Sequence, residues 1–260
     1  MKKSELKALL EKYYKKYNQP DFIKDDPISI PKMYTQKGDI EIMGFLISMI
    51  SWGQRISIIR SGHRLNELFA HEPYNSIMAS SQNEMKELGD FVHRTFNSSD
   101  LASMIWFLRW LYEDHGGLEN AIYSGIKKGE EGMKSGLEHL FQLYESSPAY
   151  LKRTCKHLPN PQSGSACKRL NMYLRWMVRK DDSGVDFGIW TQIKSSDLIC
   201  PLDVHVIRQS IKLGLLQNDK SNWKNAVILT EKLKEFDSID PVRFDYSLFG
   251  MGIEEKNSLS

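Results

Sequence analysis

The chain has 260 residues, of which 41% are hydrophobic and 26% charged, and its net charge is +2. This length is enough to bury a sizeable core, and the composition excludes disordered and fibrous proteins. The charged N-terminus lacks the apolar core of a signal peptide, and the longest apolar run, residues 42–50, is too short to span a bilayer. We therefore expect a cytoplasmic protein with no membrane partner.

Apolar residues recur at helical spacing through most of the chain, beginning with residues 4–17. Three prolines within residues 20–31 then mark an irregular connection. From Asp39, a residue type that suits the N-cap, the segment to Trp52 is apolar on nearly all sides and should form a buried central helix. A further helix should follow over residues 56–69.

The same helical pattern continues toward the C-terminus. Two serines and Asp100 should cap a helix that Gly116 stops, and an amphipathic helix should follow over residues 133–144. We expect Ser221 to cap the next helix and the Asp-Pro pair at 240–241 to begin the last one. No stretch shows sustained period-two alternation, so the fold should be all-α.

The three cysteines, Cys155, Cys167 and Cys200, are widely spaced. An odd number at such spacing matches neither a disulfide framework nor a zinc or iron–sulfur pattern. We therefore expect no metal and no cofactor, and thiols that are buried or incidental.

Positive charge collects in residues 151–216, which hold eleven Lys and Arg against five Asp. On a helical wheel of residues 166–179, Lys168, Arg175 and Arg179 fall opposite the apolar side. Such a face is either an ordinary solvated surface or an electrostatic footprint for a phosphate backbone. Both interpretations stay open at this point.

A second feature follows in the segment PLDVHVIR. Asp203 lies where its side chain can accept hydrogen bonds from the first turn of the next helix. An aspartate at this position is usually structural when it is considered alone. Its coincidence with Lys168 is what favours a functional interpretation.

These two segments resemble the helix-hairpin-helix DNA glycosylase superfamily, which includes endonuclease III and the 8-oxoguanine glycosylases. The resemblance rests on a Leu-Pro hairpin with Gly164 before Lys168, and on LDVHVIR at residues 202–208. Residues 39–58 and 244–252 are similar to the early buried helix and the final helix of that fold. The chain also looks like an uncharacterised bacterial family within or beside this superfamily.

The resemblance implies a two-lobed, all-helical glycosylase-like fold. Lobe A should cover about residues 38–199, and lobe B should combine residues 1–37 with residues 200–260. The cleft between the lobes should hold Lys168 and Asp203.

The resemblance also implies a DNA N-glycosylase that acts on a damaged base, such as an oxidised purine, with AP-lyase activity left open. Asp203 would stabilise the cationic sugar, and Lys168 would attack C1′. The expected partner is double-stranded DNA, the expected state is a monomer, and no iron–sulfur cluster is implied. The residues expected to bind DNA are Gln54, Arg55, Gly164, Arg169, Arg175, Arg179, His205 and Arg208.

Two departures from the family pattern bear on this function. The hairpin over residues 159–164 is not Leu-Pro-Gly-Val-Gly, which puts its phosphate contacts in question. The spacing from Lys168 to Asp203 is unusually long, so residues 181–195 should loop out. The alternative functions are a catalytically silent nucleic-acid-binding module with the same fold and a helical protein-interaction protein.

Overall fold

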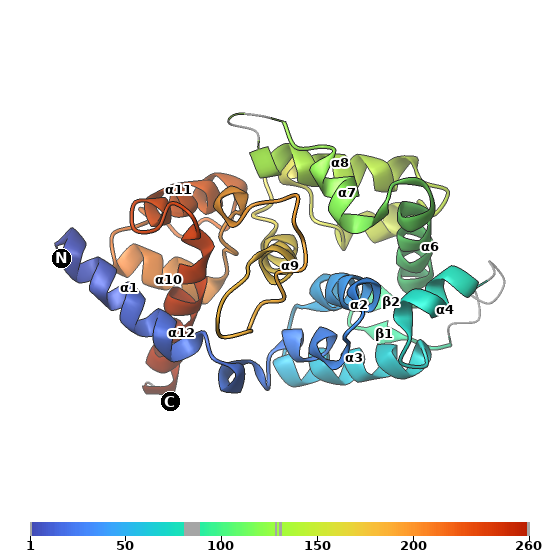
Figure 1. The fold of residues 1–260 in the computed structure, drawn as a ribbon, viewed down its shortest axis with the longest axis horizontal. Helices are drawn as coiled ribbons and strands as arrows, with labels where there is room; N and C mark the ends of the chain where they lie inside the picture. The colour runs from blue at the N-terminus through green and yellow to red at the C-terminus, as the bar shows by residue number, and fades with distance from the viewer. Residues whose placement is uncertain (1, 81–88, 128, 130–131, 259–260) are drawn as a thin grey trace. The chain divides into compact units, whose positions relative to one another are not determined.

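The computed structural model is mostly helical, which confirms the all-α class for the residues it describes (Figure 1). A two-stranded antiparallel hairpin, β1 (Val92–His93) with β2 (Phe96–Asn97), is the exception within that part of the chain. Two-residue strands are too short to produce an alternating pattern, so the hydrophobic periodicity does not predict them. The described residues are 2–80, 89–127, 129 and 132–258.

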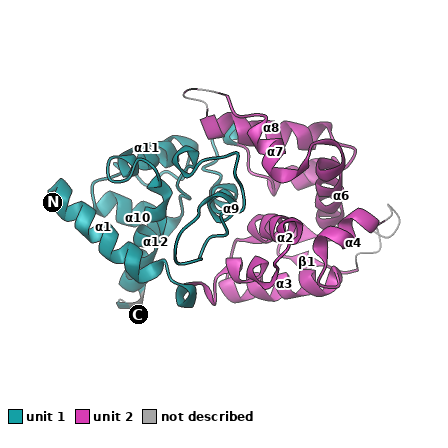
Figure 2. Cartoon of the chain, viewed as in Figure 1, with its two compact units in different colours: residues 1–22, 161–260 teal, residues 23–160 magenta. Residues whose placement is uncertain are grey.

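The chain divides into two compact units (Figure 2). Unit 1 combines residues 1–22 with residues 161–260, and unit 2 is residues 23–160. The expected lobes differ from this division, because residues 161–199 belong with the C-terminal segment. The reason is that residues 168–178 form a helix, and that Arg175 and Arg179, at its end, contact Asp245 and Asp240 in the C-terminal segment.

Unit 2 is built around α2 (Lys37–Ile50), which is buried at every position from Ile40 onward, as its apolar sequence predicted. The N-cap is Gln36, not Asp39. The Asp39 carboxylate instead accepts a hydrogen bond of 2.8 Å from the backbone N–H of Tyr74, in the first turn of α4. The other helices of this unit are η2 (Pro27–Ser29), η3 (Pro31–Met33), α3 (Arg55–Leu68), α4 (Pro73–Ala79), α6 (Ser98–Asp114), α7 (Gly117–Tyr123), α8 (Gly132–Ser146) and η4 (Lys152–Lys156).

The start of α6 is one residue earlier than the sequence suggested. Asn97 is the N-cap and its side chain accepts the N–H of Asp100 at 3.2 Å, while Asp100 accepts the N–H of Asn97 at 3.0 Å. This reciprocal arrangement is a capping box that satisfies two backbone donors. Asp100 is fully buried and also accepts a 2.7 Å bond from the hydroxyl of Thr154.

In unit 1, the last helix packs against both α1 and α10. The sequence predicts that this helix ends near Gly252, but the helix continues to Ser258. Gly250 lies against the ring of Tyr17, and Gly252 lies against the side chain of His205, with no room for a Cβ at either position. The helices of this unit are α1 (Lys3–Tyr17), η5 (Pro161–Ser163), α9 (Lys168–Val178), η6 (Ser195–Asp197), α10 (Val204–Lys212), α11 (Trp223–Lys234), η7 (Pro241–Phe244) and α12 (Asp245–Ser258), while η1 (Pro20–Ile23) crosses the boundary between units.

The long segment between α9 and α10 packs onto α9 instead of looping out. The N–H of Phe187 donates to the carbonyl of Trp176 at 2.8 Å, and the N–H of Trp190 donates to the carbonyl of Met177 at 3.0 Å. Trp190 is buried and its ring meets that of Tyr173 edge to face. The segment therefore covers the C-terminal half of α9.

Candidate functional site

The hairpin that precedes α9 is fastened to the start of α11. The carbonyl of Gly164 accepts the N–H of Trp223 at 3.1 Å, and Ser165 forms a backbone bridge with Asn222. Gly164 is exposed and has a φ of +81°, a conformation that favours glycine. Its own N–H donates to the carbonyl of Pro161 at 2.8 Å, so this N–H is already used within the hairpin.

Lys168 is the first residue of α9 and is partly exposed. It follows Cys167, a buried N-cap with the left-handed φ of +49°. The sharp change of direction at Cys167 places the lysine at the end of the helix that faces the hairpin. The remaining residues of α9 are mostly buried, so the lysine lies at the edge of the core.

Asp203 is the N-cap of α10, as the sequence predicted. Its Oδ1 accepts hydrogen bonds from the backbone N–H groups of His205 and Val206, both at 2.9 Å. Both bonds end on Oδ1, and Oδ2 accepts no hydrogen bond within the described part of the chain. The carboxylate is therefore held rigidly by one oxygen while the other can face a substrate, since the side chain is partly exposed.

Asp245, the first residue of α12, interacts electrostatically with both candidate catalytic residues. It is buried, and its carboxyl lies against the guanidinium of Arg175. Burial raises the pKa of Asp245 to about 7; the charge of Arg175 opposes this rise, Asp203 adds to it and Lys168 opposes it. Because the charges of Lys168 and Asp203 both act on this one carboxyl, the structure brings them to the same locality of unit 1.

The raised pKa of Asp245 predicts a specific dependence of stability on pH. The folded protein holds this proton up to a pH of about 7, whereas the unfolded chain releases it near its ordinary pKa of 3.8. The contribution of Asp245 to stability is therefore fully present below pH 4 and is lost as the pH rises toward 7. Urea unfolding of the wild type and of Asp245→Asn between pH 4.5 and 7.5 checks this prediction. As the pH rises, the free energy of unfolding of the wild type should fall relative to that of Asp245→Asn. A difference between the two proteins that does not change with pH would contradict the raised pKa of Asp245.

Arg175 and Arg179 do not form the exposed cationic face that the helical wheel suggested. Both are buried, and Arg179 is only 1% exposed. The guanidinium of Arg179 pairs with Asp186 at 2.9 Å and with Asp240 at 2.8 Å. The two arginines are neutralised inside unit 1, so we no longer expect them to contact nucleic acid.

These buried charges form one connected network. Asp186 accepts a hydrogen bond from the hydroxyl of Tyr246 at 2.9 Å and lies 3.4 Å from Nε of Arg175. The guanidinium of Arg175 also lies over the ring of Tyr246, 4.1 Å from its centroid. The aspartates of this network, which the sequence interpretation missed, stand between apolar residues, as in VDF and FDY. An acidic residue flanked by apolar ones is the sequence signal that could have revealed them.

The other predicted DNA-binding residues of unit 1 lie in different environments. Arg169 is half-buried, and this burial lowers the pKa of its guanidinium to about 10. Arg208 is exposed on α10. The His205 ring packs edge to face on Phe249, and its buried Nδ1 has no hydrogen-bond partner among the described residues. Of these three residues, Arg208 is the one that is exposed.

The remaining two predicted residues belong to unit 2. Gln54 is the exposed N-cap of α3, and its side chain makes no capping hydrogen bond. Arg55 follows it as the first residue of that helix and is partly exposed. The structure thus groups Lys168 with Asp203 in one unit and carries Gln54 and Arg55 on the other.

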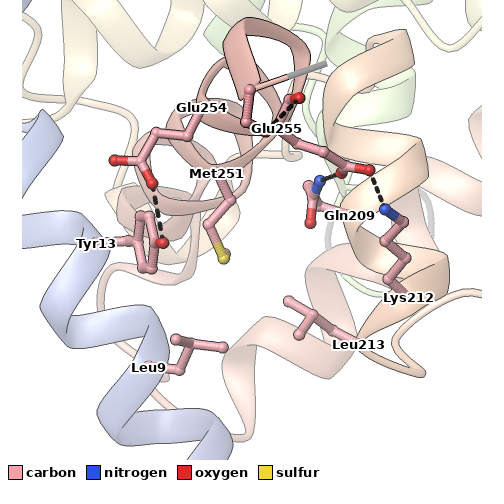
Figure 3. Close-up of a pocket in the computed structure, with 9 residues that line it drawn as sticks. Leu9, Tyr13, Gln209, Lys212, Leu213, Met251, Glu254 and Glu255 are labelled. Atoms are coloured by element: carbon pink, nitrogen blue, oxygen red, sulfur yellow. Dashed lines mark hydrogen bonds and ion pairs between the residues drawn. The ribbon is translucent and has the colours of Figure 1, made fainter.

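A shallow pocket of about 570 Å³ lies between α1, α10 and α12 (Figure 3). Glu254 accepts hydrogen bonds there from Lys16, from Tyr17 at 2.6 Å and from Tyr13 at 3.0 Å. The bond from Lys16, followed by the bonds from the two tyrosines, lowers the pKa of this glutamate to about 2. Lys168 and Asp203 are not among the lining residues, which are Leu9, Tyr13, Gln209, Lys212, Leu213, Met251, Glu254, Glu255 and Ser258. The pocket is therefore separate from the candidate catalytic residues.

No group of three or more His, Cys, Asp or Glu side chains is arranged to hold a metal ion among the residues that the structure describes. None of the described helices combines the length and apolarity needed to cross a bilayer.

Comparison with known protein families gives one match. The model of the family described as protein of unknown function (DUF2400) matches residues 26–254. The chain belongs to this family. The DUF2400 match spans unit 2 and most of unit 1, including Lys168, Asp203 and Asp245. No curated protein and no solved structure matches the chain.

Proposed function

We propose that the protein is a DNA N-glycosylase with AP-lyase activity, acting on a damaged base, with an oxidised purine as the first substrate to test. The observation that carries this proposal is the shared locality of Lys168 and Asp203, whose charges act on the same buried carboxyl of Asp245. Both side chains are partly exposed at the first turn of a helix. An amine and a carboxylate in one place suit the cleavage of an N-glycosidic bond.

Asp203 would supply the electrostatic part of the reaction. As the bond between C1′ and the base breaks, positive charge develops on the sugar, and a fixed carboxylate stabilises that charge. The two backbone hydrogen bonds to Oδ1 hold Asp203 in place before the reaction begins. Preorganisation of this kind means that little reorganisation is needed in the transition state.

Lys168 would supply the covalent part. Its neutral amine attacks C1′, the bond from C1′ to the base breaks, and the base leaves with a proton. Opening of the sugar ring, in which O4′ takes up the proton that Nζ loses, then gives an iminium between Nζ and C1′. Loss of a proton from C2′ to solvent and departure of the 3′ phosphate then cleave the strand. The target base must first leave the stack, which costs a few kcal/mol. Gln54 or Arg55 filling the vacated space stays a prediction.

The decisive experiment is borohydride trapping on duplexes that each contain one 8-oxoguanine, uracil, abasic site or oxidised pyrimidine. Borohydride reduces the iminium to a stable amine, so the wild type should give a covalent adduct with at least one duplex. Lys168→Gln should abolish the adduct, because it removes the only nitrogen that forms it. Lys7→Gln, at an exposed position on α1, is the matched control and should trap like the wild type. A Lys168→Gln protein that still forms the adduct would eliminate this mechanism.

The second candidate function is a catalytically silent nucleic-acid-binding module. It is favoured by the internal hydrogen bond of the Gly164 N–H, since a hairpin that does not contact phosphate would not position a target sugar beside Lys168, whereas binding through other surfaces does not need the hairpin. This function predicts binding that is independent of the lesion and falls steeply with salt, without adduct or base release. For either function we expect double-stranded DNA as the partner, a monomer, and a cytoplasmic location.

A further inference from the structure

A surface of unit 2, on α3 and the β1–β2 hairpin, carries arginines that the candidate catalytic site does not use. Residues 42–66 contain no Asp or Glu, although they include three arginines. Ile56, Arg60 and Arg64 are each separated by four residues, so they form one line along α3, and all three are exposed. We call this line, together with Arg94, the arginine face.

The hairpin adds Arg94 to this face. Its buried His93 shares a 2.9 Å hydrogen bond with the hydroxyl of Ser61, which fixes the hairpin on α3. Arg94 lies in the turn, and its guanidinium passes directly over Gly53, where there is no room for a Cβ. Gly53 directly precedes Gln54, the N-cap of α3, so the Arg94 side chain lies near the start of this helix.

The backbone at Arg94 supports a role for its side chain. Its φ is +56°, in the left-handed region that glycine and asparagine adopt at lower cost. Glycine also stands at position 53, with a φ of +100°, which allows the close approach of the guanidinium. Arg94 thus occupies a turn position whose backbone conformation disfavours arginine, and Gly53 leaves room for its long side chain.

These arginines differ from those of α9 in their partners. Within the described chain, Arg60 and Arg94 take part in no ion pair. Arg64 donates to the backbone carbonyl of Asp90 at 3.1 Å, and its guanidinium lies 5.4 Å from the centre of the Phe91 ring. The face therefore keeps positive charge on its surface, whereas the charges of Arg175 and Arg179 are cancelled by buried aspartates.

We infer that the arginine face binds the phosphate backbone of a nucleic acid. Arginine suits this ligand because its planar fork of donors matches phosphate oxygens. Side chains one helical turn apart, about 5–6 Å between Cβ atoms, can reach neighbouring phosphates of one strand. Ile56, 76% exposed at the end of the line, gives an apolar contact for sugars or bases. The choice of nucleic acid over an acidic protein rests on the proposed function.

The test measures binding to a fluorescently labelled duplex that contains a tetrahydrofuran abasic analogue, over a range of salt concentrations. Each phosphate contact adds about 0.9 to the slope of log affinity against log salt. Arg60→Gln/Arg94→Gln should therefore lower that slope by about 1.8 and the affinity at low salt by about 10-fold. Arg60→Lys/Arg94→Lys keeps the charge and should keep most of the slope. Lys7→Gln/Lys15→Gln, at exposed positions of unit 1, removes the same charge and should bind like the wild type.

The outcomes separate this inference from the proposed function. Unchanged affinity and slope in Arg60→Gln/Arg94→Gln would overturn the inference, even if the wild type forms the Lys168 adduct. Loss of binding in this variant, with no adduct on any duplex in the wild type, would support nucleic-acid binding by the arginine face. The same result would contradict the proposed glycosylase activity. Polyglutamate that competes as well as DNA of equal charge would assign the face to an acidic protein instead. Circular dichroism of each variant establishes that it is folded.

Discussion

Replacing Arg179 with methionine is expected to destabilise the protein by about 3–5 kcal/mol. Methionine fills much of the space but leaves Asp186 and Asp240, both held by this guanidinium, without its charge. Although burial opposes the charged form, Asp186 and Asp240 raise the pKa of Arg179 above its ordinary value. Removing one member of a buried ion-pair network costs more than the network contributes, because the remaining charges stay buried without compensation.

Arg243→Met is the matched control for this prediction. Arg243 forms ion pairs with Glu11 at 2.7 Å and Asp237 at 2.9 Å, but its partners are partly exposed. Water can solvate these carboxylates when the arginine is removed, so a loss of about 1 kcal/mol or less is expected from the ion pairs. Urea unfolding followed by tryptophan fluorescence compares the two variants. Equal losses in both would show that the burial of the Arg179 network has no energetic importance.

Asp203→Asn should lower the rate of base release by about 10²–10³-fold while changing stability little. Asparagine is as good an N-cap as aspartate, so the bonds to the N–H groups of His205 and Val206 can persist. What asparagine cannot supply is the negative charge that stabilises the sugar cation. The measurement is single-turnover base release, on the duplex that gives an adduct with the wild type, alongside urea unfolding.

Asp203→Ala separates the structural role from the catalytic one. It should lose the cap as well, at a cost of about 0.5–2 kcal/mol, and show the same drop in base release. If Asp203 were only a cap, Asp203→Asn would keep the wild-type rate and Asp203→Ala would affect stability alone. That result would favour the silent binding module.

The long helices could be predicted because their apolar periodicity extends over several turns. α2 and α8 are examples, and both lie where the pattern placed them. α4 and α7 have seven residues each, too few for a repeat to stand out from the surrounding sequence. The N-caps of α2, α6 and α11 lie one to three residues from the expected positions, because several polar residues stand near each start. For α11, Asn222 is the cap rather than Ser221.

The candidate site was predictable only where the local sequence determines it. Asp203 as an N-cap depends on its own helix, and that prediction is confirmed. The environment of Arg175 and Arg179 depends on Asp240 and Asp245, which are more than 60 residues further along the chain. A helical wheel shows which side chains share a face but not what that face meets. For this reason, a buried ion-pair network was interpreted as an exposed basic stripe.

The division of unit 1 into two distant stretches of chain constrains the order in which the protein can fold during synthesis. α1 packs on α12, and more than 200 residues separate the two helices. At about 5–20 residues per second, the ribosome needs roughly 10–45 s to make that intervening stretch. Unit 2 is complete in sequence long before then. α1 therefore has to wait for α12, and its apolar stripe stays uncovered by this native partner until α12 has been made.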